Sequence, residues 1–164
     1  MIARGIHHIG MNSANASALV EFYTQILDFR LVTDFVGWRD YREADALVGT
    51  EGSAAAFAML QCSNCYLEIF QYENPASENL GAKRAWDRGY THLCLGVDDV
   101  VAAHHELKTR GMPFLAESPV DFGEIKAIYG RDPDGNLIEL IQTTGDHPFA
   151  FSGLKVETPC GAGG

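Results

Sequence analysis

Hydrophobic and polar residues follow an order along this chain that occurs twice. In the first occurrence, a short apolar stretch from Ile6 to Met11 precedes a segment from about Ala16 to Leu27 with apolar residues at every third or fourth position. This spacing predicts an amphipathic helix. Three further segments have the composition of strands, with Ser63-Asn64 as the turn between the last two: Phe29 to Val36, Ala54 to Leu60, and Cys65 to Tyr72.

The second occurrence has the same sequence of elements. Thr91 to Val97 predicts a strand, and a helix follows Asp99 and ends at Gly111. The later strands are expected at three segments, with Asp132-Pro133-Asp134-Gly135 as a turn: near Pro113 to Ala116, Ile125 to Tyr129, and Leu137 to Gln142. The chain therefore predicts a duplicated strand–helix–three-strand unit of the α+β class. We expect one domain over residues 1–142, built of modules at about 4–72 and 90–142 with a linker at 73–89, and a tail at 143–164.

Composition narrows the class of protein. The 164 residues are 46% hydrophobic and 21% charged, as in ordinary globular domains. A net charge of −10 argues against nucleic acid or an anionic membrane surface as the main partner. We expect a cytoplasmic protein, because no apolar run reaches ~18 residues and the first residues do not resemble a signal peptide. Cys62 and Cys65 have the spacing of zinc ligands but lack a second pair, which favours a hairpin turn.

One histidine and one glutamate occupy corresponding places in each predicted module. They are His8 and Glu68 in the first, and His92 and Glu139 in the second. Alternation along the last strand of each module puts its glutamate on a face with large apolar side chains. A buried carboxylate must be paired or bind a metal. A single strand histidine is most often a core residue, but two matching pairs favour a divalent metal site.

The sequence resembles the vicinal oxygen chelate superfamily, which includes glyoxalase I, methylmalonyl-CoA epimerase, extradiol dioxygenases and bleomycin-resistance proteins. The resemblance covers about residues 5–142. It rests on five segments, of which the last is the most specific: IHHIG at 6–10, FYTQILDF at 22–29, YLEIF at 66–70, GYTHL at 89–93 and DPDGNLIEL at 132–140.

This resemblance implies two tandem βαβββ modules whose curved mixed sheets form an open cradle around one divalent ion (Ni, Co, Zn, Mn or Fe). The implied ligands are His8, Glu68, His92 and Glu139, which leave two positions for adjacent oxygens of a small-molecule substrate. The implied enzyme is a metal-dependent isomerase or lyase of the glyoxalase I or epimerase type, which abstracts a proton next to a carbonyl through a metal-bound enediolate. Glu139 is then the primary base and Glu68 the opposing acid. We expect a homodimer, with the modules paired either within one chain or between chains.

Two other functions stay open. Tyr129, ten residues before Glu139, matches a tyrosine of Fe(II) extradiol ring-cleaving dioxygenases, although Glu68 would be an extra ligand for them. The other function is that of a resistance-type protein that only binds a small molecule, although such relatives typically lack the metal ligands. Tyr129 is also a candidate substrate-binding residue.

Three further side chains are candidates for substrate binding. Arg84 and Arg88 in the linker could hold an anionic group, or could be surface charges paired with acidic neighbours. Trp38 contributes to a loop, residues 37–53, that is apolar enough for a bulky or aromatic substrate.

Overall fold

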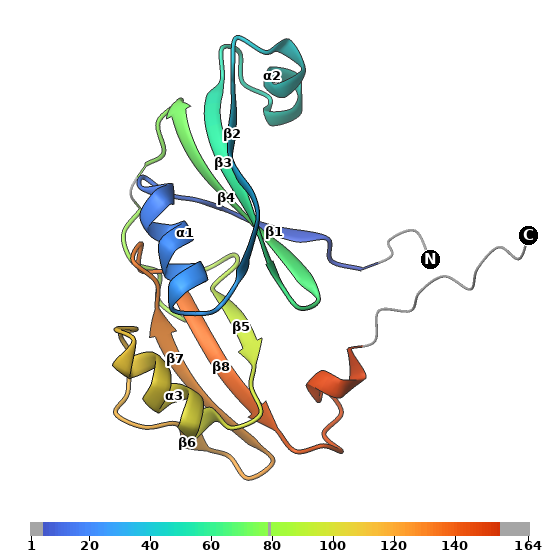
Figure 1. Ribbon diagram of the computed structural model, residues 1–164, viewed down its shortest axis with the longest axis vertical. Coiled ribbons are helices and arrows are strands. Elements are labelled where there is room, and N and C mark those ends of the chain that lie inside the picture. Colours follow the sequence, from blue (N-terminus) through green and yellow to red (C-terminus); the bar gives the residue numbers. More distant parts are fainter. Residues whose placement is uncertain (1–4, 79, 155–164) are drawn as a thin grey trace, which may run out of the picture.

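Two four-stranded mixed sheets, one from each module, form the framework. The computed structural model describes residues 5–78 and 80–154 (Figure 1). The N-terminal sheet has the order β1-β4-β3-β2, and the C-terminal sheet has the order β5-β8-β7-β6. In each sheet the first strand runs parallel to the last, and the other neighbours are antiparallel. The strands are β1 (His8–Asn12), β2 (Arg30–Arg39), β3 (Ala54–Cys62), β4 (Cys65–Asn74), β5 (His92–Gly96), β6 (Val120–Asp121), β7 (Ile125–Arg131) and β8 (Leu137–Thr143). The predicted α+β fold is confirmed.

The helix of each module is held at its N-terminus in the same way. α1 (Ala16–Gln25) begins after Asn15, and α3 (Val100–Thr109) begins after Asp99, whose side chains cap the first turns. The first backbone N–H of α1 donates to Gln71 Oε1 at 3.0 Å, and that of α3 donates to Gln142 Oε1 at 3.1 Å. Each glutamine comes from the last strand of its own module. The repeated bond shows the duplication in atomic detail.

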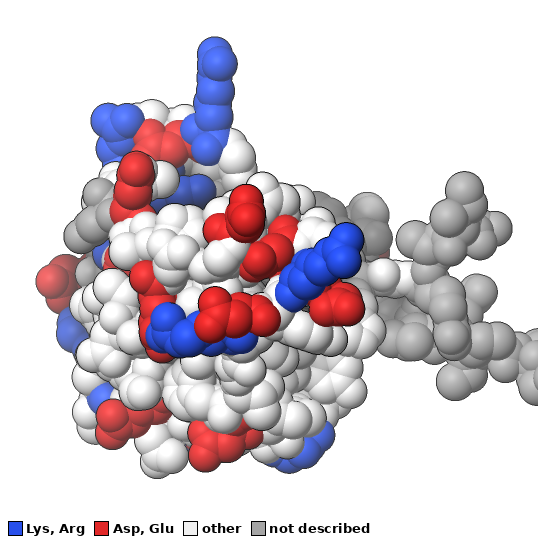
Figure 2. Space-filling view, turned by 90° about the horizontal axis from the view of Figure 1, so that it is seen from above, with Lys and Arg blue, Asp and Glu red and all other residues white. Residues whose placement is uncertain are grey.

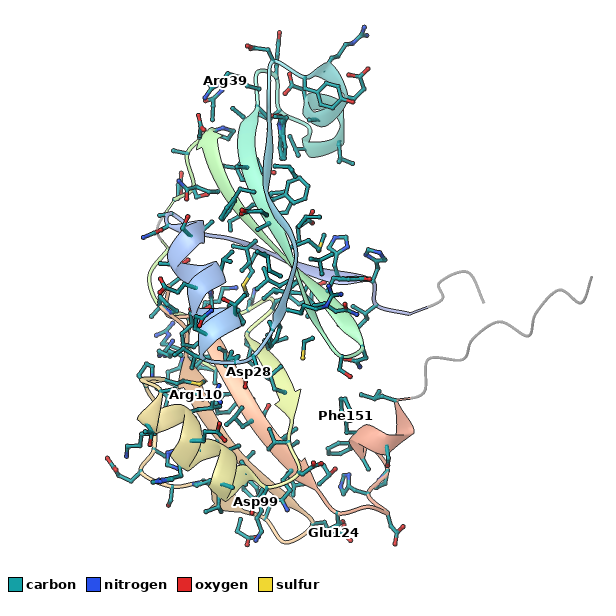
Figure 3. All side chains as sticks on the ribbon, viewed as in Figure 1. Asp28, Arg39, Asp99, Arg110, Glu124 and Phe151 are labelled. Carbon is teal, nitrogen blue, oxygen red and sulfur yellow. The ribbon has the colours of Figure 1, made fainter. Side chains whose placement is uncertain are left out.

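The modules join through their helix-bearing faces. α1 and α3 lie on the same side of the molecule in Figure 1, and one buried cluster of apolar side chains includes residues of both. The Tyr23 hydroxyl of α1 donates to Asp132 Oδ2 of the C-terminal module at 3.2 Å. At the surface Arg110 Nη1 lies 2.9 Å from Asp28 Oδ1 (Figure 3). The opposite faces of the two sheets consequently carry no α-helix, although Phe151 of a 3-10 helix packs against Gly96 on that face of the C-terminal sheet.

A short helix that the sequence did not predict interrupts the loop between β2 and β3. α2 (Arg42–Val48) projects from the end of the N-terminal module in Figure 1 and has no buried residue, so it leaves no apolar periodicity to detect. Its loop is closed by Asp45, whose carboxylate accepts the backbone N–H groups of Gly52 and Ser53 at 2.8 and 2.7 Å. The loop is therefore ordered by polar contacts.

The strand expected at Pro113 to Ala116 is wrong. Only a single bridge between Phe114 and Gly130 forms there, and the outer strand is instead β6. Pro113 has no N–H to donate to a ladder, which explains the displacement. The predicted tail contains the last residue of β8 and a 3-10 helix, Phe151–Gly153, and its residues 155–164 lie outside the described chain.

The surface offers no extended patch of one charge on the face that Figure 2 shows, where acidic and basic side chains are interspersed. In the described part of the chain, no helix is long and apolar enough to span a bilayer.

Candidate metal and substrate site

The open face of the N-terminal sheet carries the first predicted histidine–glutamate pair. His8 lies on β1 and Glu68 on the neighbouring β4, and His8 Nε2 is 3.4 Å from Glu68 Oε2. The His8 side chain is 43% exposed, whereas that of Glu68 is 15% exposed. We call this pair the N half-site.

The open face of the C-terminal sheet carries the second pair, the C half-site. His92 Nε2 of β5 lies 3.1 Å from Glu139 Oε2 of β8. Two further side chains surround this carboxylate. The Tyr129 hydroxyl donates to Glu139 Oε2 at 3.4 Å, and Cys94 is the direct register partner of Glu139. Partial burial and then the Glu139 charge raise the pKa of the Cys94 thiol to about 12, and the same causes raise the pKa of Tyr129. Both groups therefore stay protonated.

The other nitrogen of each histidine ring also has a partner. His8 Nδ1 lies 2.9 Å from His7 Nδ1, and His92 Nδ1 lies 2.9 Å from Thr91 Oγ1. A partner at Nδ1 fixes the ring orientation and leaves Nε2 for a metal, as is usual around metal-binding histidines. Because Nε2 in both rings already points at a carboxylate oxygen, the residues of each half-site fit a divalent ion with nitrogen and oxygen ligands.

A single chain does not bring the half-sites together. Within residues 5–78 and 80–154, no three His, Cys, Asp or Glu side chains lie close enough to share a metal ion. A hollow of about 250 Å³ between the modules is lined by apolar residues together with Asp28, Glu106 and Arg110, and contains none of the four expected ligands. The two half-sites therefore lie apart in one chain. Binding of one ion by all four residues stays a prediction, which requires the N half-site of one chain and the C half-site of a second copy.

The other candidate residues have different surroundings. Trp38 and Tyr129 lie on the half-site faces of their sheets. Arg84 pairs with Asp87 at 2.7 Å and stacks at 5.4 Å over the Trp86 ring, while Arg88 is exposed in the linker. A substrate role for these four residues stays a prediction.

Two side chains of this face were missed from the sequence. Phe57 and Tyr72 line the same face as Glu68 and Phe70, and their signal was the alternation along β3 and β4. Cys62 and Cys65 are register partners across the predicted two-residue turn, which confirms the hairpin.

Comparison with known proteins decides the family. The model of the glyoxalase/bleomycin resistance protein/dioxygenase superfamily matches residues 5–140. The chain belongs to this superfamily. The resemblance read from the sequence is thereby confirmed, over a span that includes both half-sites.

Several proteins with similar sequences carry lyase names. A probable lactoylglutathione lyase of Vibrio cholerae is 27% identical over 143 residues, which cover 87% of this chain and 93% of that protein. A virulence protein of Salmonella typhimurium is 30% identical over 150 residues, covering 87% and 86%. Among solved structures, a glyoxalase family protein from Bacillus cereus has a TM-score of 0.73 at 15% identity, covering 85% of this chain and 94% of that one. This last likeness concerns the fold.

Proposed function

We propose that this protein is a metal-dependent lyase or isomerase that moves a proton on the carbon next to a carbonyl group. The observation that carries the proposal is the duplicated half-site, with imidazole Nε2 within 3.4 Å of a carboxylate in one sheet and 3.1 Å in the other. The lactoylglutathione lyase names of the relatives support the same reaction class.

The proposal includes a homodimer in which the N half-site of one subunit faces the C half-site of the other. Two-fold symmetry pairs the faces reciprocally and so makes two complete sites. The edge strand β2 supports this arrangement, because of its ten residues only Trp38 is not exposed. Its exposed apolar side chains include Leu31 at 41% and Val36 at 50%. Exposed apolar surface of this kind marks an interaction face.

The chain's own groups would divide the work as follows. His8, Glu68, His92 and Glu139 hold the ion, which when bound supplies a Lewis acid for adjacent substrate oxygens. Glu139 takes the proton from the substrate carbon as general base. Tyr129 orients that carboxylate by a hydrogen bond, and Cys94 packs beside it. Glu68 returns a proton as the opposing acid.

Mixing two inactive variants tests the shared site. His8→Ala and His92→Ala each damage both sites of their homodimers. A mixed dimer has one site with both substitutions and one site with none. Since random mixing makes about half of the dimers mixed, about a quarter of the wild-type metal sites and of the turnover should return. The assay is metal content and hemithioacetal isomerisation after refolding the two variants together.

The matched control mixes His8→Ala with Glu68→Ala, which remove the two ligands of the same half-site. Every mixed dimer then has a defect in both sites, so no activity should return. If the first mixture stays inactive although mixed dimers form, the shared site is wrong.

The Tyr129–Glu139 contact also keeps the Fe(II) dioxygenase as a second candidate. An isomerase or lyase needs no oxygen, so its turnover should be equal in anaerobic buffer. Oxygen-dependent ring cleavage of a catechol would favour the dioxygenase. Stoichiometric small-molecule binding without metal or turnover would favour a binding protein.

A further inference from the structure

Four aromatic side chains meet on the open face of the N-terminal sheet. Ring centroids of Phe57 and Phe70 are 5.4 Å apart, and those of Phe70 and Tyr72 are 5.8 Å apart, with tilts of 40° and 34°. The Trp38 ring stands at 79° to Phe70 and at 88° to Tyr72. We call these four residues the aromatic corner: Trp38, Phe57, Phe70 and Tyr72. The rings of Phe57, Phe70 and Tyr72 form its floor, and the Trp38 ring forms its wall.

The wall of the corner is held in place from the α2 loop. Trp38 Nε1 donates to Ser53 Oγ at 2.9 Å, and the Ser53 hydroxyl donates to Asp45 Oδ1 at 2.6 Å. Ser53 is fully buried. A satisfied indole N–H and a buried support restrict the ring to one orientation, which lowers the entropic cost of binding against it.

The fold itself does not require these rings. The two sheets have matching rows: the row of Glu68 and Met59 corresponds to that of Glu139 and Tyr129. One row further, the N-terminal sheet pairs Phe57 with Phe70, whereas the C-terminal sheet pairs Ala127 with Ile141. The row after that contains Tyr72 in one sheet and Thr143 in the other. The same framework thus forms without aromatic residues, which points to a role in binding.

The corner lies next to the N half-site. Phe70 follows Glu68 by two residues on the same face of β4, a separation of about 7 Å along the strand. All four rings are partly exposed, as suits a surface that receives a ligand.

Several basic groups of this module and of the linker have partners of their own. Arg39, beside the corner in sequence and labelled in Figure 3, forms an ion pair with Glu73. Lys83 donates to the Tyr90 carbonyl at 2.8 Å, and Arg84 pairs with Asp87. The surroundings thus favour an uncharged apolar group over an anionic one.

We propose that the aromatic corner binds a flat aryl substituent on the carbon that bears one of the two adjacent substrate oxygens. This inference rests on the proposed function, because the half-site residues must hold the oxygens while the corner holds the ring. Aromatic contacts add to the free energy gained by burying the ring and prefer the edge-to-face and offset geometries that the corner offers. The substrate class is accordingly an aryl-substituted carbonyl compound with an adjacent oxygen.

A pair of hydroxamates tests the inference without requiring turnover. Benzohydroxamate and acetohydroxamate share the same two-oxygen chelating group and differ in phenyl against methyl. Titration calorimetry on the full chain reconstituted with Co(II) should give a dissociation constant about tenfold lower for benzohydroxamate. Trp38→Leu should abolish most of this ratio, and Trp38→Phe should restore part of it. Trp86→Leu, which removes the only other tryptophan, 77% exposed in the linker, is the matched control and should leave the ratio unchanged.

The outcomes separate the two proposals. If both hydroxamates bind and their ratio is the same in wild type, Trp38→Leu and Phe70→Leu, the aromatic corner is wrong and the metal site stands. If neither hydroxamate binds the Co(II) protein, the proposed metal site fails and the inference fails with it. Size-exclusion chromatography measures the oligomeric state of each variant. The corner would be assigned to subunit contact, and the inference overturned, by two results together: the Trp38→Leu protein dissociates, and the Trp38→Phe protein stays dimeric but shows no aryl preference.

Discussion

The two modules share one framework and differ in what they place around the same glutamate. In the N-terminal sheet the neighbours of Glu68 in its row are Gly10 and Met59, which offer no hydrogen bond from a side chain to the carboxylate. In the C-terminal sheet the neighbours of Glu139 are Cys94 and Tyr129: the Tyr129 hydroxyl donates to it, and the Cys94 thiol lies beside it as register partner. The two modules thus carry equivalent histidine–glutamate pairs with unequal surroundings.

The surroundings of the two glutamates suit different roles in the proposed reaction. Glu139 lies between two protonated neighbours and is held in a fixed orientation by Tyr129, as a base that must meet a carbon-bound proton requires. Glu68 borders the apolar surface of the aromatic corner. The N-terminal module therefore suits recognition of the substrate, and the C-terminal module suits the chemical step.

The largest expected effect comes from exchanging each glutamate for glutamine. Glu139→Gln keeps the size and one ligand oxygen but removes the base, so turnover should fall about a hundredfold or more. Glu68→Gln should be milder, because an amide oxygen can still coordinate. Turnover per bound metal, with metal measured on each sample, checks the ranking. The opposite ranking at equal metal content would assign the base to Glu68 and reverse the division between modules.

Removing either histidine should give the same loss of metal, which tests the equivalence of the half-sites. If each ion takes ligands from both modules, His8→Ala and His92→Ala should lose stoichiometric metal alike. Metal at about a hundred times its dissociation constant stabilises the wild-type fold by about 2.7 kcal/mol, and this gain should be absent from both variants. Thermal unfolding with and without metal measures it, with the exposed His105→Gln as control. Retention of metal by only one variant would show that one module binds alone.

The stability of the contact between the two modules is expected to depend on Tyr23. Its buried hydroxyl donates to Asp132 Oδ2, and three other donors, from Asp134 and Asn136, serve the same carboxylate. Tyr23→Phe removes one hydrogen bond to a buried charged group and should cost about 1–2 kcal/mol of unfolding free energy. Urea unfolding measures the change, and the exposed Tyr41→Phe is the control. An unchanged midpoint would mean that the remaining donors stabilise this contact by themselves.

The sequence predicted those features of the fold and the candidate site that depend on residues close together along the chain. The apolar stripe of α1, the hairpin turn at Ser63–Asn64 and the position of both histidine–glutamate pairs were readable because each element repeats with its own period. α2 was not readable, since a helix with no buried face has no such period. The aromatic corner was not readable as a unit either, because register between β2, β3 and β4 brings its members together.

The separation of the half-sites lay beyond the sequence for a related reason. Whether Glu68 and Glu139 meet within one chain depends on which faces the modules bury against each other. That choice is made by the shared cluster under α1 and α3, together with Tyr23 and Asp132. Both arrangements of two such modules have the same strand and helix pattern.

The smallest expected effect concerns a histidine present in one module only. His104 is the fifth residue of α3, where α1 has Val20. Its side chain packs at 4.5 Å against the Phe114 ring, only 7% of its surface is exposed, and Nε2 has no hydrogen-bond partner within the described chain. Burial, and then the Lys108 charge, lower the pKa of His104 below its ordinary 6.5, while Glu117 acts in the opposite direction.

The sign of the resulting pH dependence is fixed. Above about pH 6.5, His104 is neutral in both the folded and the unfolded chain. Below this pH the unfolded chain binds a proton at His104, whereas the folded chain does not until the pH falls below its lower folded-state pKa. The free energy of unfolding therefore decreases over this range. His104→Val should reduce this loss of unfolding free energy at acid pH by about 1 kcal/mol. Urea midpoints of metal-free protein at about pH 7.5 and about pH 5 measure it, and His105→Gln, changed at the exposed neighbouring residue, should keep the wild-type loss. An equal loss in the His104→Val protein would assign the acid sensitivity to other groups and leave the two helices equivalent in this respect.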